Sequence, residues 1–487
     1  MLKGMLINCI ISTSAIILLQ KLIFLQIMRA KKPPFEPDKI YQHALYLHNE
    51  GKLKEAEGLY KMLLDFFPDQ VEVISALAAL LLQLGQQEKG IALLKKSLSL
   101  NPLQPSALFN LGIELQKQTL LEEALQRYDQ ALALNPKDIN VLINRGNTLK
   151  DLKQYRDAIS SFERALSIQP SSASAHWNKA LTHLLIGEYE QGWREYEWGW
   201  ECGERGRVRK FTQPVWLGEE SISGKTIFVY REQGLGDLIQ FSRYLPLLEK
   251  QGAQVILEAP ASLISLMRSI SKTIIVLEDN QPLPYFDFVC PVMSLPLAFK
   301  TTIDSIPAEV PYVTINQDKK KVWREKLGVK TKPRVGVVWS GSMTNKIDLN
   351  PCARRNIPLE QLKTIFELPL EFHALQKEFR PEDEALIVGI KNIQLHQYEL
   401  HDFSDTAALI QEMDLIVSVC TSVTHLAGSL NQPAWVLLPY SADYRWMLNA
   451  NDSKWYPSIK LIRQTKINDH TGQVKELLKG LKAKFSV

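Results

Sequence analysis

The chain has 487 residues, of which 57 are Lys or Arg and 53 are Asp or Glu, so its formal net charge is only +4. So small a positive surplus excludes the basic footprint typical of nucleic-acid-binding proteins, and we expect no nucleic-acid partner. The length predicts roughly three structural units. The five cysteines include no C-x-x-C pair and no His cluster lies at ligand spacing. This pattern predicts a reducing compartment and no metal site.

The first thirty residues, 1–30, are mostly apolar from Met5 to Met28 and are interrupted by Lys21. Three interpretations stay open. A membrane anchor needs about 20 apolar residues, and the charge-free run here is shorter. A cleaved signal peptide has no A-x-A site to end it. An extension upstream of a start at Met28 fits the RAKKPPFEP that follows. We therefore expect a cytoplasmic protein, with attachment to the inner membrane through residues 1–30 as the alternative.

A period of 34 residues runs through the next part of the chain. The prolines Pro68, Pro102, Pro136 and Pro170 recur at this spacing, and so do the large residues Tyr60, Leu94, Tyr128 and Phe162. Gly112 and Gly146 share one small position of the repeat, and Gly51, Gly85 and Gly187 share the turn between its two helices. Small residues let two helices approach closely, and proline ends a helix. The pattern resembles the tetratricopeptide repeat. It implies an α-helical superhelix over residues 37–205, with four repeats and a degenerate fifth.

A stack of such repeats has a concave surface suited to an extended partner. Asn110, Asn144 and Asn178 share one position on the first helix of successive repeats, and an amide can both donate to and accept from a peptide backbone. We expect them to bind a protein acceptor or partner, although asparagine is also an ordinary consensus residue there. The tryptophan-rich end of the fifth repeat is expected to cover the next domain, since a terminal repeat must close its open face.

From residue 206 onward the pattern changes to alternating strands and helices, which predicts parallel sheets in two Rossmann-like units. These units span residues 206–316 and 333–487, and a polar, lysine-rich stretch lies between them. The expected strands are Thr226–Tyr230, Gln254–Glu258, Thr273–Leu277 and Phe286–Cys290, then Arg334–Trp339, Glu371–Leu375, Leu415–Val419 and Ala434–Leu438. Ligands of such sheets bind outside the carboxyl ends of the strands, so we expect a cleft between the units.

A glycine-bracketed carboxylate follows the first of these strands, in the sequence Gly234, Leu235, Gly236, Asp237. Glycines let the backbone approach a ligand, and the N-terminus of the next helix offers unpaired N–H groups. The turn is therefore a candidate ligand site. Asp237 is also well placed to cap that helix.

Five segments carry a more specific resemblance: REQGLGD, VGVVWSGS, the Arg355 segment RNIPL, DTAALIQEMDLIVSVCTSVTHLAGSL and PAWVLLP. In this order they resemble the GT-B glycosyltransferases of the heptosyltransferase type, glycosyltransferase family 9. Placed behind tetratricopeptide repeats, they also resemble the protein O-GlcNAc transferases in architecture. The resemblance covers most of residues 37–464 and implies a GT-B fold of two Rossmann-like domains.

On the acceptor side, the resemblance implies that Asp237 is the general base, which takes the proton from an acceptor hydroxyl as that hydroxyl attacks the anomeric carbon. Gly234 and Gly236 would then border the acceptor. On the donor side, it implies a nucleotide-sugar site formed by Thr421, Ser422, His425, Arg355 and Gln376. Hydroxyls and free N–H groups at a helix start suit a diphosphate.

Other roles are open for two of these donor residues: His425 could be a buried helix histidine and Arg355 a solvated surface charge. Tyr440 and Trp446 could border the base, although packing suits Trp446 better. The family pattern has an aspartate before the threonine, where this chain has Cys420.

The resemblance therefore implies a metal-independent, inverting glycosyltransferase that uses a nucleotide sugar as its substrate and needs no cofactor. Its acceptor would be a protein or a glycan, held or recruited through the repeat groove. The alternative is a repeat scaffold with a transferase-like domain that no longer catalyses. The intact turn at Asp237 favours the enzyme, and Cys420 favours the scaffold.

Overall fold

The computed structural model of the protein describes residues 35–341, 350–448 and 450–487. The expectations for residues 1–30 lie outside this range. Within it, no helix combines the length and the apolar character that a membrane crossing requires. The chain divides into two compact units after Val141, within helix α8 (Ile139–Asp151). Repeats four and five therefore belong to the same compact unit as both sheets.

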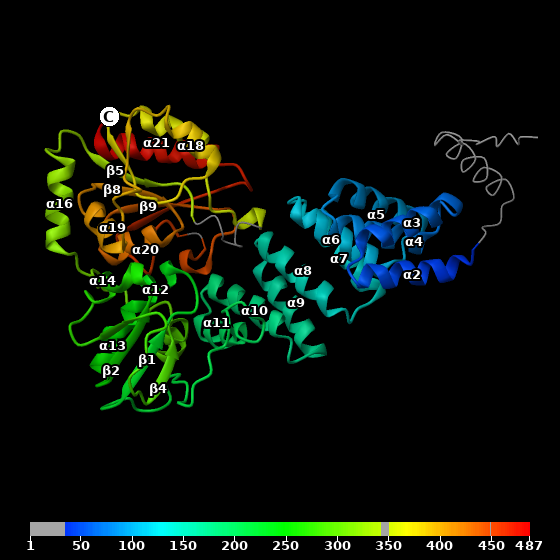
Figure 1. The fold of residues 1–487 in the computed structure, drawn as a ribbon, viewed down its shortest axis with the longest axis horizontal. Coiled ribbons are helices and arrows are strands. Elements are labelled where there is room, and N and C mark those ends of the chain that lie inside the picture. Colours follow the sequence, from blue (N-terminus) through cyan, green and yellow to red (C-terminus); the bar gives the residue numbers. More distant parts are fainter. Residues whose placement is uncertain (1–34, 342–349, 449) are drawn as a thin grey trace, which may run out of the picture. The chain divides into compact units, whose positions relative to one another are not determined.

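The first unit consists of paired helices, coloured blue to cyan in Figure 1. They are α2 (Pro37–Asn49), α3 (Leu53–Phe66), α4 (Val71–Gln83), α5 (Gln87–Leu100), α6 (Pro105–Lys117) and α7 (Leu121–Leu134). Gly112 shows why a small residue recurs with the period. A Cβ atom there would lie 2.5 Å from the ring of the fully buried Tyr128, so only glycine lets α6 and α7 pack this closely.

The turn inside each repeat places one residue in the left-handed region. The five positions are 34 residues apart, with Gly51 (φ 76°), Gly85 (φ 75°) and Gly187 (φ 89°) in three repeats. Thr119 (φ 61°) and Lys153 (φ 64°) take the same conformation in the other two. Non-glycine residues visit this region at a steric cost, because Cβ crowds the following carbonyl.

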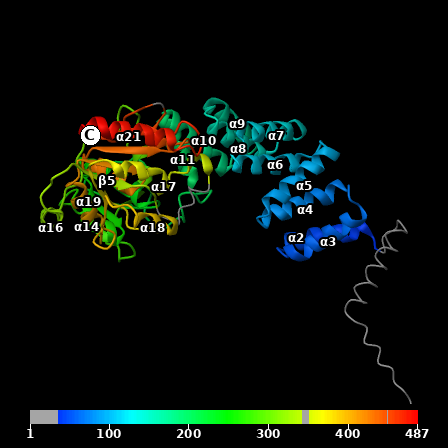
Figure 2. The same ribbon diagram turned by 90° about the horizontal axis from the view of Figure 1, so that it is seen from above.

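The second unit begins with the rest of α8 and continues with α9 (Tyr155–Ile168), α10 (Ala173–Ile186) and α11 (Tyr189–Tyr196). Helix α10 packs against the turn Tyr444–Trp446, and α11 packs against α15 (Leu295–Ala298). Both views show α10 and α11 beside the part of the chain that contains the two sheets (Figure 1, Figure 2). Trp193 is buried and meets Phe241 and Tyr444 edge to face. The expectation that the aromatic end of repeat five covers the next domain is confirmed.

The first sheet has four parallel strands in the order β3-β2-β1-β4. The strands are β1 (Thr226–Tyr230), β2 (Gln254–Ala259), β3 (Ile275–Glu278) and β4 (Phe288–Pro291). The single helix expected after β1 is split into α12 (Leu235–Phe241) and α13 (Leu245–Lys250), with a 3₁₀ turn between them. Pro246 explains the break, because proline has no N–H to continue the hydrogen-bond ladder of α12.

The two faces of this sheet are covered differently. Side chains such as Ile227 and Val229 join a large core shared with the helices and with the second sheet. On the other face, Phe228 and Tyr230 pack in a small cluster with Trp200 and Phe211 from the segment that leads out of the repeats. This segment without regular secondary structure, which we call the strap, covers the face of the sheet that a crossover helix usually covers in such folds.

The second sheet has six parallel strands in the order β10-β9-β8-β5-β6-β7. They are β5 (Arg334–Val338), β6 (Glu371–Ala374), β7 (Ile393–Leu395), β8 (Leu415–Val419), β9 (Ala434–Leu438) and β10 (Ile459–Arg463). Its helices include α17 (Leu359–Leu362), α18 (Pro381–Ile387), α19 (Phe403–Ile410), α20 (Ser422–Ser429) and α21 (Thr471–Phe485). The polar stretch before this sheet contains helix α16 (Gln317–Leu327), which ion pairs such as Lys319–Asp402 hold against α19.

Candidate functional site

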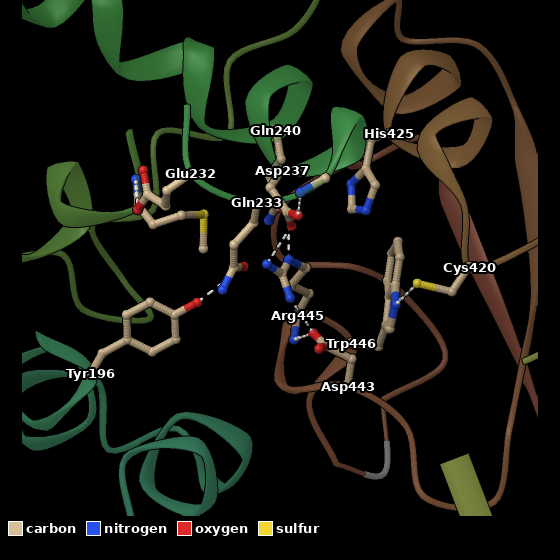
Figure 3. Close-up of polar contacts among 12 residues, drawn as sticks. Tyr196, Glu232, Gln233, Asp237, Gln240, Cys420, His425, Asp443, Arg445 and Trp446 are labelled. Carbon is tan, nitrogen blue, oxygen red and sulfur yellow. Dashed lines mark hydrogen bonds and ion pairs between the residues drawn. The ribbon is translucent and has the colours of Figure 1, made fainter. Parts of the chain in front are cut away.

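The turn between β1 and α12 lies against the start of α20 from the second sheet (Figure 3). Gly236 makes this approach possible, because a Cβ atom there would lie 2.8 Å from Cδ2 of His425 and 3.3 Å from Cα of Ser422. Both helices begin at the carboxyl ends of parallel strands, where ligands of such sheets usually bind. The structure thus brings Gly236, Asp237, Ser422 and His425 together.

Asp237 uses both of its carboxylate oxygens. The N–H of Gly234 donates to Oδ2 over 2.8 Å, which caps the start of α12 as the sequence allowed. Nη2 of Arg445 donates to Oδ1 over 2.5 Å. Each carboxylate oxygen of Asp237 thus already accepts a hydrogen bond from the protein. In this conformation Asp237 is a helix cap and an ion-pair partner.

Arg445, which follows β9 of the second sheet, contacts two residues of α12 from the first sheet. Its Nε donates to Oε1 of Gln240 over 3.0 Å, and its Nη1 donates to Oδ1 of Asp443 over 2.8 Å. The side chain is 9% exposed and its guanidinium lies over the ring of Tyr444. Burial opposes the charged form, but Asp443 and Asp237 outweigh it, and the pKa of Arg445 lies well above its usual range. The guanidinium is therefore a fixed positive charge between two carboxylates.

His425 is buried, and its Nδ1 is 3.1 Å from the hydroxyl of Tyr456. Burial first, and then the charge of Arg445, lower the pKa of His425 well below its usual range. The imidazole is therefore neutral at neutral pH, with one nitrogen able to donate. Its ring stacks on Trp446, whose Nε1 donates to Sγ of Cys420 over 3.1 Å.

Burial raises the pKa of Cys420 to about 11. The position where the family pattern has an aspartate thus holds an uncharged thiol.

Thr421 is the N-cap residue of α20 and is almost fully buried, while the half-buried Ser422 is its first helical residue. Arg355 donates from Nη1 to the carbonyl of Cys420 over 3.1 Å, next to this helix start. Its Nε is buried and has no hydrogen-bond partner among the described residues. A guanidinium with an unpaired Nε, beside the first N–H groups of a helix, favours binding of an anion here.

Gln376 lies at the end of β6, and protein groups use its amide fully. Its Oε1 accepts from the N–H groups of Trp339 and Ser340, and its Nε2 donates to Oγ of Ser340 and to the carbonyl of Glu378. The side chain holds the end of β5 in place. Its predicted contact with a donor stays a prediction.

The three asparagines lie on the first helices of their repeats, Asn110 on α6, Asn144 on α8 and Asn178 on α10, and all are half-buried. Nδ2 of Asn178 donates to the carbonyl of Ser174 within its own helix. Their use by a partner stays a prediction.

Two parts of the site were missed by sequence reasoning. The first is Arg445, whose partners on α12 lie 205 and 208 residues away in the chain, so no local pattern marks it.

The second missed part is a buried network of charged side chains next to the turn between β1 and α12. Arg205, the last residue of the predicted repeat array, donates to Glu232 over 2.5 Å and to Glu197 over 2.7 Å. Burial raises the pKa of Glu232 to about 7 against the opposing effect of Arg205.

Glu232 belongs to the REQGLGD segment, which was the available signal for this network. Gln233 beside it accepts from the hydroxyl of Tyr196 over 3.2 Å, as Figure 3 shows. Repeat five thus holds the predicted acceptor turn directly. No group of three or more His, Cys, Asp or Glu side chains suited to a metal ion occurs among the described residues.

Comparison with known proteins identifies the repeats. Two sequence models of the tetratricopeptide repeat match residues 139–172 and 71–102, so the chain contains tetratricopeptide repeats. A curated relative is Protein FlbA of Caulobacter vibrioides (strain ATCC 19089 / CIP 103742 / CB 15), 25% identical over 311 residues, which are 58% of this chain and 50% of FlbA. The chain thus spans about half the length of the curated relative that it matches.

Among solved structures, one of MamA is 22% identical and covers 33% of this chain and 95% of its own, with a TM-score of 0.31. A tetratricopeptide repeat protein from Parabacteroides merdae ATCC 43184 is 20% identical and covers 33% of this chain and 64% of its own, also with a TM-score of 0.31.

Proposed function

We propose that the protein is a metal-independent, inverting glycosyltransferase of the GT-B type that transfers a sugar from a nucleotide sugar to a protein or glycan acceptor. The contact of Gly236 with His425 carries this proposal. It joins the helix starts that follow β1 and β8, so that the turn with Gly236 and Asp237 lies against the first turn of α20. Open α/β sheets bind ligands at such strand ends. The tetratricopeptide repeats supply the surface for the acceptor or for a protein partner.

In this proposal the donor diphosphate binds at the start of α20, where the hydroxyl of Ser422, the free N–H groups and Arg355 all favour an anion. Neutral His425 has a ring nitrogen left for a hydrogen bond, since the other faces Tyr456. Asp237 takes the acceptor proton. The proposal requires Arg445 to move away from Oδ1, so that this oxygen can accept the proton of the acceptor hydroxyl.

The second candidate function is a scaffold that binds partners or nucleotides without catalysis. Cys420 favours it, since a buried thiol with a raised pKa cannot supply the charge of the aspartate that the family has there. The two contacts of Asp237, with the N–H of Gly234 and with Arg445, also favour the scaffold, because they give this carboxylate a structural role.

The test measures nucleotide release from a panel of nucleotide sugars by the full chain and by Asp237→Asn. We expect release with at least one donor and a loss of about 100-fold or more in the variant, since general-base catalysis contributes roughly that much. Asp405→Asn is the matched control, because Asp405 caps α19 in the same capping-box position, away from this site. It should lose stability but keep its turnover rate.

Release from no donor, or equal rates in wild type and Asp237→Asn, would contradict the catalytic assignment. Donor binding by calorimetry without any turnover would support the scaffold instead.

A further inference from the structure

Lys153 takes the left-handed turn position that glycine takes in three of the five repeats. A lysine in this conformation has a steric cost that glycine does not have, and residues with strained backbones are often found at functional sites. Its ammonium lies 3.9 Å from the ring centroid of Tyr440, in the loop that follows β9. The fourth repeat therefore places a cation at the carboxyl end of the second sheet.

Two further cationic side chains, Arg463 and Lys150, lie near the loop that follows β9. Arg463 ends β10, beside β9, and donates to the carbonyls of Ala450 and Trp446. Lys150, in the last turn of α8, is half-buried near Asp151 and Asp443. Asp151, next to Lys150, accepts from the hydroxyl of Ser441 over 3.1 Å. The end of α8 and Lys153 therefore lie against one short loop of the second sheet, residues 440–443. Through Asp443 this loop continues to Arg445 and so to the predicted base.

The carboxylates near these cations already have other partners, since Oδ1 of Asp151 accepts from the hydroxyl of Ser441. Neither Lys150 nor Lys153 forms a hydrogen bond or an ion pair with a described residue, and the carboxylate of Asp443 already accepts from Arg445. Burial lowers the pKa of Lys150, although Asp151 and Asp443 oppose it. Burial and the like charge of Arg463 lower the pKa of Lys153. Partly desolvated cations held near one another are stabilised by an incoming anion.

We propose that Lys150 and Lys153 of the fourth repeat, with Arg463 of β10, bind the phosphoryl groups of the nucleotide-sugar donor, so that the repeat array completes the donor site. This inference rests on the proposed function for the identity of the ligand. It assigns to the repeats a part in donor binding, in addition to their part in binding an acceptor or partner.

The experiment measures binding of inorganic pyrophosphate, UDP, GDP and ADP to the full chain by calorimetry at fixed salt. Lys153→Gly removes the ammonium and also relieves the turn, so the variant should fold at least as well as the wild type. Lys150→Met removes a charge and keeps the aliphatic stem. Thr119→Gly is the matched control, because it makes the same change at the same turn position in the third repeat.

We expect each lysine variant to weaken binding of pyrophosphate and of the best nucleotide about tenfold or more, as the loss of a charge-assisted hydrogen bond implies. Thr119→Gly should bind as the wild type does. Dissociation constants within twofold of wild type in both lysine variants would overturn the inference and leave the proposed function standing. Weakened pyrophosphate binding in a chain that binds no nucleotide would instead overturn the donor assignment together with the proposed function.

Discussion

Gly236 allows a sharp test of the contact between the two sheets. An alanine Cβ at this position would stand 2.8 Å from Cδ2 of His425 and 3.3 Å from Cα of Ser422. The imidazole cannot turn away freely, because Tyr456 faces one nitrogen and Trp446 stacks on the ring. The Cα atom of Ser422 belongs to the backbone of α20. Gly236→Ala should therefore push α12 and α20 apart.

The expected cost follows from packing. Overfilling a close-packed contact destabilises a protein by about 1–3 kcal/mol, and the better helix propensity of alanine returns at most about 1 kcal/mol. We expect a net loss of about 1–2 kcal/mol. Gly234→Ala is the control, since its Cβ would meet only the Asp237 side chain, at 3.1 Å. Gly234→Ala should lower the free energy of unfolding by less than about 1 kcal/mol, which is typical of a substitution at an N-cap residue.

The assay is urea unfolding followed by tryptophan fluorescence, applied to a double-mutant cycle. The four proteins are the wild type, Gly236→Ala, His425→Ala and the double variant. Removing the imidazole takes away the nearest obstacle, so the double variant should lose less stability than the sum of the two single changes. Strict additivity, or equal losses in Gly236→Ala and Gly234→Ala, would refute the reasoning.

Two further predictions concern other parts of the molecule. His373 and His396 are buried 3.0 Å apart, and burial lowers their pKa values to about 3 and about 4. Below pH 6.5 the unfolded chain therefore binds more protons than the folded one, so stability should fall as the pH drops from about 6.5 toward 4, and less steeply in His396→Gln when urea midpoints are compared across pH. In the repeats, Gly112→Ala should lower the melting temperature through its clash with Tyr128, whereas Gly58→Ala, with open space around it, should raise stability by about 0.5–1 kcal/mol through helix propensity. Equal shifts in these two variants would contradict the packing argument.

The parts of the fold that follow from short-range patterns were predictable. The 34-residue period depends on residues such as Gly112 and Tyr128, which meet within one repeat, so the helix pairs could be placed from the sequence. The central strands were found as continuous apolar runs, as fits buried parallel strands. Strands β7 and β10, at the two edges of the second sheet, were missed. β7 has three residues and none of them is buried, and Lys460 and Arg463 interrupt the apolar residues of β10.

The site divides in the same way. The helix start at Asp237 could be predicted, since glycines, a carboxylate and a preceding strand lie within a dozen residues. Its pairing with Arg445 could not, because that contact depends on how two sheets pack. Lys153 is an intermediate case. Its position follows from the repeat period, but its proximity to Tyr440 is a tertiary contact.

The strap over the first sheet has a consequence for how the protein can be divided and made. Trp200 and Phe211 come before β1, the strand that they cover, in the chain. Phe286, which belongs to the same cluster, follows only after β2 and β3. A fragment that starts at residue 206, the boundary expected from sequence, would lose Trp200 and the buried Arg205 and would expose an aromatic sheet face to solvent. We therefore expect such a fragment to aggregate more readily than the longer chain. Fragments for structural or biochemical work should keep repeats four and five attached.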